Sequence, residues 1–489
     1  MGCCWRPYDV ILTGKSSTLE KDHALNQLQN NLEFHLEDYH PCFQNETSDG
    51  HELGRAYIHG LFKTEAGKRN MERMNEELEL SGAGYQRIQQ FITDSTWSAD
   101  NLIRQIARDT SDLYARQPHY QRRQVGLILD ESAHLKKGTH SVGVARQYAG
   151  VAGKVENCQV GVYASLVWNS HSTLIDERLY LPQAWTADPK RCEKAGIPEG
   201  QRTFKTKLEL ALEMVKANQE AGVAFDWVGG DGLYGHGFEL SNALDNMGLT
   251  FLLDVHCSQR VYPLKPNLRL ESTAPPGTKA TEPPTDTDPL RVDVYANEWA
   301  AYEWPTVTVR EGTKGPLILS MHVAPVWLWD SKTATWIERV LVISRNQADN
   351  KIKYSLSNAD YLTTPTDRFA YMQAQRYWVE RAFQEAKSEL GMSDYQVRKW
   401  NAWHHHMALV MLSLSFLVKE RILNKIEYPL LSCRDIRLMI IALLLNDPSA
   451  VERRIAQLKS RHEQRRKDIE RCYKRNVSNE LGSTTKVTK

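Results

Sequence analysis

The chain has 489 residues, of which 41% are hydrophobic, and this is enough for about three domains with ordinary apolar cores. Its 61 basic and 60 acidic residues leave a formal charge of +1, so any nucleic-acid surface must come from local clustering. The eight cysteines include no CxxC pair, which argues against a disulfide framework and indicates a reducing compartment. The apolar runs are shorter than the roughly 18 residues of a membrane span, so we expect a cytoplasmic protein without a membrane segment.

The first 120 residues carry helical patterning. An apolar stripe between Leu102 and Ala107 follows Ser98, a suitable N-cap, and indicates a helix. This segment also contains cations and aromatic side chains that could hold DNA, although a solvated helix surface would have the same composition. They are Lys63, Lys68, Arg69, Arg73 and Arg87 with Tyr57, Tyr85 and Trp97.

From Val125 the pattern changes to short apolar runs typical of strands. Val125 to Leu129 ends at Asp130, and Phe225 to Gly230 ends at Asp231. An amphipathic helix is expected between them, from Phe204 to Ala221. An aspartate after a strand is often a turn former or a helix cap, but two such aspartates can also meet at one edge of a sheet.

A further strand is expected from Thr250 to Val255, followed by an extended loop in the Pro- and Thr-rich stretch from Glu271 to Pro289. Beyond this loop the sequence contains short β-rich runs with no convincing helix between them, which favours an all-β insertion. The runs are Val292 to Tyr295, Thr306 to Val309, Leu317 to Val323, Thr335 to Ser344 and Lys353 to Ser357.

A long helix is predicted up to Glu389, with Gly391 as its C′ residue. Arg376, Glu380 and Lys387 share one face, whereas Glu385 and Glu389 lie about 140° and about 180° around the axis from Glu380. The shared face could also be a surface ladder of ion pairs.

Near the C-terminus, His404, His405 and His406 point in different directions on a helix, so they cannot form a His₃ metal site. From Val451 to Arg475 there are ten Lys or Arg against four Asp or Glu. Such a basic helix can grip phosphate, or it can be a soluble tail.

Three carboxylates, two at strand ends and one on a late helix, can converge on one edge of a sheet. Convergent carboxylate oxygens suit hard divalent cations such as Mg²⁺, and two such ions can support phosphoryl transfer. The two strand-end aspartates and one glutamate of the late helix are therefore candidate metal ligands, and Glu380, Glu385 and Glu389 are all available on that helix. Flanking cations such as Arg376 and Lys387 suit a polyanionic substrate.

Several long stretches carry a resemblance to a known family. They are KKGTHSVGVARQYAG after the Asp130 strand, GKVENCQVGV from Gly153, RLYLPQAW from Arg178, FKTKLELAL from Phe204, WVGGDGLYG from Trp227 and RYWVERAFQEAKSELG from Arg376. Together they resemble DDE-superfamily insertion-sequence transposases with an RNase H-like core, in the branch that carries a Tyr-Arg-Glu-Lys signature and a β-strand insertion. Arg376, Glu380 and Lys387 fit this signature, but Gln373 stands at the tyrosine position and Tyr371 lies two residues earlier.

The resemblance implies an α/β fold in which an RNase H-like mixed sheet, flanked by helices, is interrupted by the insertion. The expected segments are an N-terminal helical DNA-binding domain at 1–120, the first part of the core at 121–255, the insertion at 256–362, the second part of the core at 363–425 and a helical region with a basic tail at 426–489.

The resemblance also implies a Mg²⁺- or Mn²⁺-dependent transposase with two ions held by Asp130, Asp231 and Glu380. Such an enzyme cleaves the ends of its element and joins the 3′ ends to target DNA. Its expected partners are double-stranded DNA, comprising terminal inverted repeats and target, and a second copy in a synaptic homodimer at the nucleoid. Arg376, Lys387, Lys136 and Lys137 are the expected DNA contacts. The alternatives are a repurposed DNA-binding protein without chemistry and an RNase H-like nuclease that does not join DNA.

Overall fold

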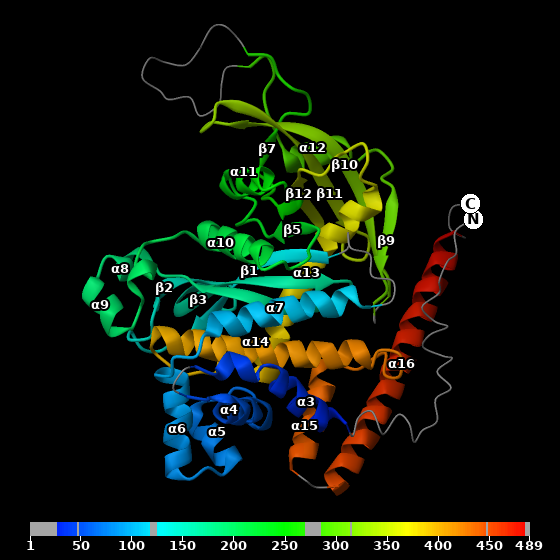
Figure 1. The fold of residues 1–489 in the computed structure, drawn as a ribbon. Helices are drawn as coiled ribbons and strands as arrows, with labels where there is room; N and C mark the ends of the chain where they lie inside the picture. The colour runs from blue at the N-terminus through cyan, green and yellow to red at the C-terminus, as the bar shows by residue number, and fades with distance from the viewer. Residues whose placement is uncertain are drawn as a thin grey trace. The chain divides into compact units, whose positions relative to one another are not determined.

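The computed structural model describes residues 27–45, 48–117, 125–268, 285–312, 315–445 and 448–484 (Figure 1). By packing, the chain divides into two compact units. The described residues of the first unit come from Met1–Tyr120, Asp130–Ala224 and Trp378–Lys489. Those of the second come from Gln121–Leu129 and Phe225–Tyr377.

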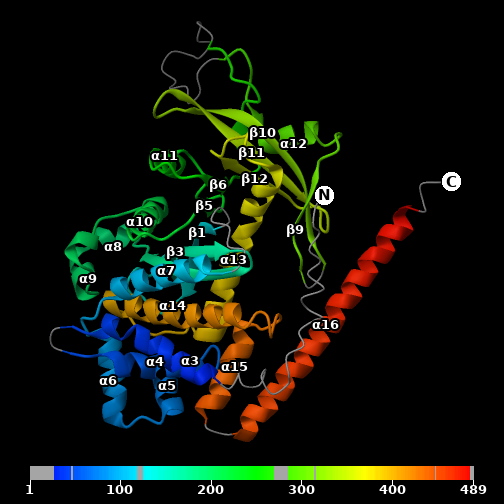
Figure 2. The ribbon, with the colours of Figure 1, turned by 45° about the vertical axis from the view of Figure 1, so that its right-hand side comes forward.

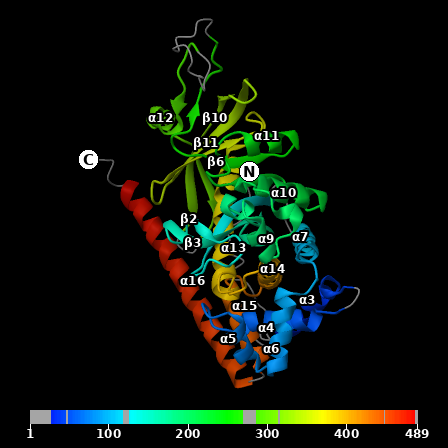
Figure 3. The same cartoon turned by 90° about the vertical axis from the view of Figure 1, so that its left-hand side faces the viewer.

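Short helices open the first unit. They are α3 (Leu28–Asp38), η1 (His40–Phe43), α4 (His51–Lys63), α5 (Met71–Leu78), α6 (Gly82–Thr93) and α7 (Ala99–Ala115). Ser98 caps α7 as predicted, because its Oγ accepts a hydrogen bond from the amide of Asn101 at 3.2 Å. The apolar stripe between Leu102 and Ala107 is buried, and Figure 3 shows α4, α5 and α6 grouped together. The helical prediction for this segment is therefore confirmed.

Strands and short helices follow in the same unit. They are β2 (Ala145–Ala149), β3 (Lys154–Trp168), β4 (His171–Leu179), α8 (Gln183–Thr186), α9 (Pro189–Lys194), η3 (Glu199–Gln201) and α10 (Lys207–Glu220). Strand β3 pairs antiparallel with both β2 and β4. Helix α10 confirms the predicted helix, and a capping box of Thr206 and Glu209 fixes its first turn.

The C-terminal helices complete the first unit. They are α14 (Trp400–Leu423), α15 (Cys433–Leu444) and α16 (Pro448–Thr484). Helix α14 is apolar on nearly all sides because it is surrounded by other elements; it runs beside α7 and packs on β4 (Figures 1 and 2). In the described part of the chain, none of the helices has the length and apolarity needed to cross a bilayer.

Strand β1 (Val125–Leu135) belongs to both units, since its first five residues lie in the second unit and the remainder in the first. The other elements that begin in the second unit are β5 (Trp227–Gly230), α11 (Glu239–Asn246), β6 (Phe251–Asp254), β7 (Arg260–Val261), β8 (Leu290–Arg291), α12 (Val292–Glu298), β9 (Thr306–Arg310), β10 (Leu317–Asp330), β11 (Thr335–Asn346), β12 (Ile352–Ser357) and α13 (Thr366–Leu390).

The sheet of the second unit has the order β1-β5-β6-β12-β11-β10-β9. Its first three strands are parallel, and the later pairings are antiparallel (Figure 2). The protein is thus mixed α/β with a mixed sheet, as predicted, and this arrangement is consistent with an RNase H-like fold. The antiparallel strands and α12 share an apolar core that includes Val326, Leu341 and Ile343.

The prediction of an all-β insertion is wrong at Val292 to Tyr295. These residues open helix α12, in which Val292, Tyr295 and Ala296 are buried. Burial at positions i, i+3 and i+4 is the helical pattern, and over so short a stretch the β-branched valines favoured a strand. Of the Pro- and Thr-rich stretch that was predicted to be an extended loop, residues 271–284 lie outside the described residues.

Candidate active site

The parallel pairing of β1 with β5 stops at Leu129 and Gly230. Strand β5 ends there, but β1 continues to Leu135, so the prediction that the first strand ends at Asp130 is wrong. The register of the two strands pairs Gly126 with Trp227 and Leu129 with Gly230. Both strands are buried up to these last paired residues. Asp130 and Asp231 are the next residues along their chains, where the burial of each strand is first relieved. Because the pairing is parallel, the register favours neighbouring positions for the two residues that follow its last pair, Asp130 and Asp231.

The turn after β5 is fixed by hydrogen bonds to Asp231. Its Oδ1 accepts from the amide of Leu233 at 2.9 Å, and its carbonyl oxygen accepts from the amides of Tyr234 and Gly235. A Cβ atom at Gly235 would lie 2.0 Å from the carbonyl oxygen of Asp254, so this position requires glycine. The turn chemistry expected of a strand-terminal aspartate is therefore present, and it brings the turn against the end of β6.

Asp254 ends β6, and the sequence analysis did not single it out. Its Oδ1 accepts a hydrogen bond from the Ser355 hydroxyl at 2.6 Å, and its Oδ2 lies 3.2 Å from Nε of Arg376. Burial raises the pKa of Asp254; the charge of Asp231 acts in the same direction, while Ser355, Lys353 and Arg376 oppose it. The available signal was the apolar run before Asp254, which resembles the runs before Asp130 and Asp231.

Two positions of the family signature, Gln373 and Arg376, lie in the first half of α13, which belongs to the second unit. Arg376 is three-quarters buried and engages Asp254. Gln373, which occupies the tyrosine position of the signature, is buried and donates from Nε2 to the Ser355 hydroxyl at 2.8 Å. Tyr371 lies instead beside the guanidinium of Arg368. Gln373 thus supports the hydroxyl that binds Asp254.

Asp130 lies in the first unit with the second half of α13. Its Oδ1 accepts a hydrogen bond from the amide of Glu131 at 2.8 Å. Glu131 itself binds Lys207, whose Nζ lies 2.9 Å from its Oε1. Burial lowers the pKa of Lys387, and the negative charge of Asp130 opposes this shift. Lys387 is therefore close enough to Asp130 to interact with it electrostatically.

The three glutamates of α13 have different surroundings. Glu380 is exposed. Glu385 is buried, with Arg421 at 3.3 Å and Sγ of Cys433 also at 3.3 Å. Glu389 is buried, with NH1 of Arg437 3.6 Å from its carboxylate.

The two lysines after β1 also differ. Lys136 donates to the carbonyl oxygen of Tyr395 at 2.8 Å, and its ammonium lies 3.4 Å from the centre of the Tyr395 ring. Burial lowers the pKa of Lys136 to about 7, with Asp394 opposing the shift. Lys137 is exposed. Of these two lysines, Lys137 is the one whose side chain is exposed to solvent.

Several other residues that were considered as metal ligands or DNA contacts are buried or bind other residues of the protein. His404 binds Glu177, His405 binds the carbonyl oxygens of Ile92 and Trp97, and His406 binds the Tyr57 hydroxyl. The three histidines therefore point in different directions, as expected. Tyr57, Arg69 and Trp97, which were considered for DNA binding, are all buried.

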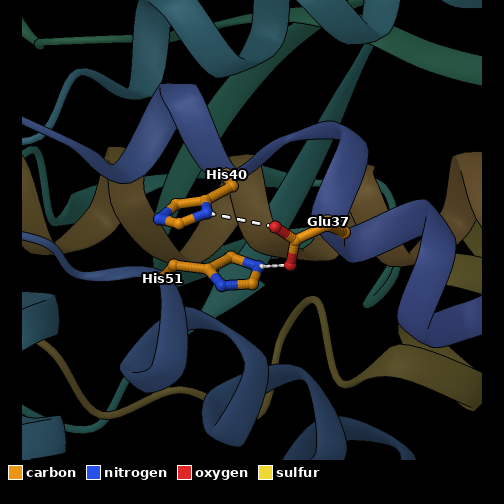
Figure 4. Close-up of side chains that lie close together, drawn as sticks. All are labelled: Glu37, His40 and His51. Carbon is orange, nitrogen blue, oxygen red and sulfur yellow. Dashed lines mark hydrogen bonds and ion pairs between the residues drawn. The ribbon is translucent and has the colours of Figure 1, made fainter.

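Among the described residues, Glu37, His40 and His51 could hold a metal ion, because their ligand atoms lie within 4.8 Å of one another (Figure 4). Glu37 contacts Nδ1 of His40 at 3.2 Å and Nε2 of His51 at 3.7 Å. Nε2 of His51 also lies 3.2 Å from the Leu36 carbonyl oxygen, and Nε2 of His40 lies 2.7 Å from Asp49. These contacts explain why the three side chains lie together, because they link the end of α3 to the start of α4. Its two imidazoles suit zinc better than Mg²⁺.

Comparison with known proteins identifies the class to which this geometry belongs. Residues 38–316, more than half of the chain, match the family described as DDE superfamily endonuclease. The chain belongs to this family, whose members generally use divalent metal ions.

A particular relative is a protein of Microchaete diplosiphon described as "Probable transposase for insertion sequence element IS701". The two chains are 27% identical over 177 residues, which cover 36% of this chain and 42% of the relative. The match therefore spans less than half the length of that relative.

The carboxylates fit a divalent metal ion by their chemistry. Carboxylate oxygens are the ligands that hard cations prefer, and the register of β1 and β5 favours neighbouring positions for Asp130 and Asp231. Structural zinc sites differ from this group of carboxylates, because their four ligands are usually cysteine sulfur and histidine nitrogen atoms.

Proposed function

We propose that this protein is a DNA transposase of a bacterial-type insertion sequence. In this proposal it cleaves phosphodiester bonds at the ends of its element and joins the 3′ ends to target DNA. The observation that carries the proposal is the parallel register of β1 and β5, in which an aspartate follows the last paired residue of each strand, in a member of the DDE endonuclease family. The relationship to a probable insertion-sequence transposase supports the same role.

Asp130, Asp231 and Glu380 are the proposed catalytic residues and metal ligands. Two Mg²⁺ or Mn²⁺ ions bound there would activate the attacking oxygen and stabilise the leaving oxygen. Glu380 is preferred over its neighbours on α13 because it is exposed, whereas Glu385 and Glu389 are buried in ion pairs with Arg421 and Arg437. A carboxylate that is needed for a structural ion pair is poorly placed to bind a metal ion.

The remaining residues of the site hold carboxylates or DNA. Arg376 positions Asp254 at the β6 end and, with Lys387 and Lys137, is a proposed contact for the DNA backbone. Lys136 contributes less in this proposal, because its ammonium is bound to Tyr395. The proposed partners are the inverted repeats of the element, target DNA and a second copy of the chain in a synaptic dimer.

The test uses purified full-length protein, Mg²⁺ and a labelled duplex that carries the element end and its flanking DNA. Asp130→Asn and Asp231→Asn should each lower cleavage by at least about a hundredfold, since even the outer-shell partners of metal ligands contribute about 10- to 100-fold. Glu131→Gln makes the same carboxylate-to-amide change one residue along and should retain cleavage. Near-normal cleavage by either aspartate variant would remove that residue from the site.

A joining assay separates the proposed function from its alternatives. Transfer of the labelled 3′ end into a target plasmid supports the transposase. Cleavage without transfer would indicate a nuclease, and DNA binding without cleavage by the wild-type protein would indicate a repurposed DNA-binding protein.

A further inference from the structure

A second region of the first unit contains a cluster of positive charge. A cavity of about 370 Å³ lies between the loop after β1, helix α9 and the segment that enters α14. We call it the basic pocket, and its cationic side chains are Arg191, Lys194, Arg398 and Lys399, with His140 beside them. No aspartate or glutamate is among its described lining residues. Closely spaced cations repel one another, so their retention around one cavity indicates an anionic ligand.

Arg191 is held in place before any ligand binds. Its guanidinium lies 3.7 Å from the centre of the Trp185 ring, and its NH2 donates to the carbonyl oxygen of Thr139 at 3.0 Å. Trp185 is buried, and its indole N–H donates to the Val144 carbonyl oxygen at 2.8 Å. This stacking and hydrogen bonding reduce the conformational entropy that Arg191 loses when it binds a ligand.

Main-chain hydrogen bonds join the three segments around the pocket. The amide of Val142 donates to the Arg398 carbonyl oxygen at 2.9 Å, and the amide of Trp400 donates to the Ala195 carbonyl oxygen at 2.9 Å. The loop, the end of α9 and the start of α14 are therefore braced against one another. The fold thus fixes the spacing of the main-chain positions that carry these cations.

Most of this charge is available for binding. Lys399 pairs with Asp94, whose Oδ1 lies 2.9 Å from its Nζ. Within the described residues, Lys399 is the one of the four cations that forms an ion pair. Lys194 and Arg398 are exposed. A nearby cavity of about 540 Å³ has the acidic Asp100 and Glu213 in its lining, so these two cavities of the first unit differ in charge.

We infer that the basic pocket binds the phosphate backbone of DNA. This inference rests on the proposed function, which supplies the polyanion. The loop that leads from β1 to Thr139 and His140 begins directly after the strand that carries Asp130, so one segment of the first unit connects the proposed catalytic residue to the pocket. The contacts are to phosphates and carry no sequence preference.

The test measures how salt weakens binding of the full chain to labelled duplexes of two unrelated sequences, between about 50 and 200 mM salt. The double variant Lys194→Gln/Arg398→Gln removes two exposed cations. Each phosphate contact contributes about 0.9 to the slope of log K against log salt, so the slope should fall by about 1.8. The fall should be the same for both duplexes. Lys216→Gln, which removes an exposed cation from α10 outside the pocket, should leave the slope unchanged.

An unchanged slope in the double variant, together with normal DNA binding by the wild-type protein, would overturn the pocket while leaving the proposed function intact. A slope that falls equally in Lys216→Gln would overturn it too, because the effect would then be one of general charge. Failure of the wild-type protein to bind either duplex would count against both proposals. The single variants Lys194→Gln and Arg398→Gln, each expected to change the slope by about 0.9, repeat the test if the double variant melts at a lower temperature.

Discussion

The ends of β5 and β6 and the junction of α13, α14 and α15 differ in their arrangement of charge. In the second unit, Asp254 has Arg376 beside it but also lies near a second acid, Asp231, whose like charge adds to the rise in the pKa of Asp254. In the first unit, the buried acids of the junction have basic partners, Glu385 with Arg421 and Glu389 with Arg437. Matched charges indicate a structural role, whereas like charges that remain together reduce stability and indicate a ligand that relieves the repulsion.

The largest effect that would test this contrast is on α13 itself. Glu380→Gln should lower cleavage by at least about a hundredfold at equal amounts of folded protein, because it removes a proposed metal ligand from an exposed position. Its melting temperature should change little, because surface substitutions usually have small effects on stability. Cleavage and thermal unfolding, measured on the same preparation, provide the two readouts.

The matched change at Glu385 should show the reverse behaviour. Glu385→Gln leaves Arg421 without its buried partner, which costs about 3 kcal/mol of unfolding free energy, while cleavage per folded molecule is retained. An active Glu380→Gln beside an inactive but stable Glu385→Gln would exchange the roles assigned to the two residues.

Asp254→Asn tests the acidic side of the comparison. The amide can keep the Ser355 hydrogen bond but loses the charge that attracts Arg376. Cleavage should fall by about 10- to 100-fold, the range seen when a group that orients a metal site is removed. Ser320→Ala, a polar change on β10 away from the β5 and β6 ends, is the control and should leave cleavage unchanged. Full activity of Asp254→Asn would make Asp254 a structural residue.

The two lysines after β1 offer a smaller test. Lys137→Gln should lower the slope of log K against log salt by about 0.9, because an exposed cation is removed from the proposed DNA surface. Lys136→Met should change the slope less, since the ammonium is already bound to Tyr395. Equal changes in the two variants, measured on one duplex, would mean that Lys136 leaves Tyr395 when DNA binds.

The sequence predicted the parts of this arrangement that depend on local pattern. Apolar runs before Asp130 and Asp231 predicted the two strands, although β1 continues past Asp130 to Leu135. The rotation of about 100° per residue separated Glu380 from Glu385 and Glu389. The register that pairs Leu129 with Gly230 could not be predicted, because strand pairing depends on segments about a hundred residues apart.

Other features depend on tertiary contacts that have no signal in the sequence. Asp254 follows an ordinary apolar run, and its role is visible only beside Ser355 and Arg376. The basic pocket combines Arg191 and Lys194 with Arg398 and Lys399, which are far apart in the sequence, so the sequence gives no sign that they surround one cavity. The tertiary surroundings also decided against DNA binding by Tyr57 and Trp97, whose aromatic rings are buried against histidines of α14.

The smallest expected effect concerns a third arrangement, in which charges are matched but lie at the surface. His40 lies between Asp49 at 2.7 Å and Glu37 at 3.2 Å, its ring stacks on His51, and these carboxylates raise the pKa of His40. Hydrogen bonds from the amide of His51 and from His40 lower the pKa of Asp49 to about 2.

A histidine whose pKa is higher in the folded state adds stability below the unfolded value of about 6.5, and this stability is lost as the pH rises through the folded value. His40→Gln should therefore lower the melting temperature more at pH 6 than at pH 8.5. Exposed pairs contribute little, so the difference should be small, and Asp49→Asn should reduce it in the same pH range.

A pH-independent effect of His40→Gln would mean that ring stacking on His51, and not charge, links α3 to α4. A melting temperature that rises on addition of Zn²⁺ in the wild-type protein but not in His40→Gln would instead assign Glu37, His40 and His51 to a metal ion.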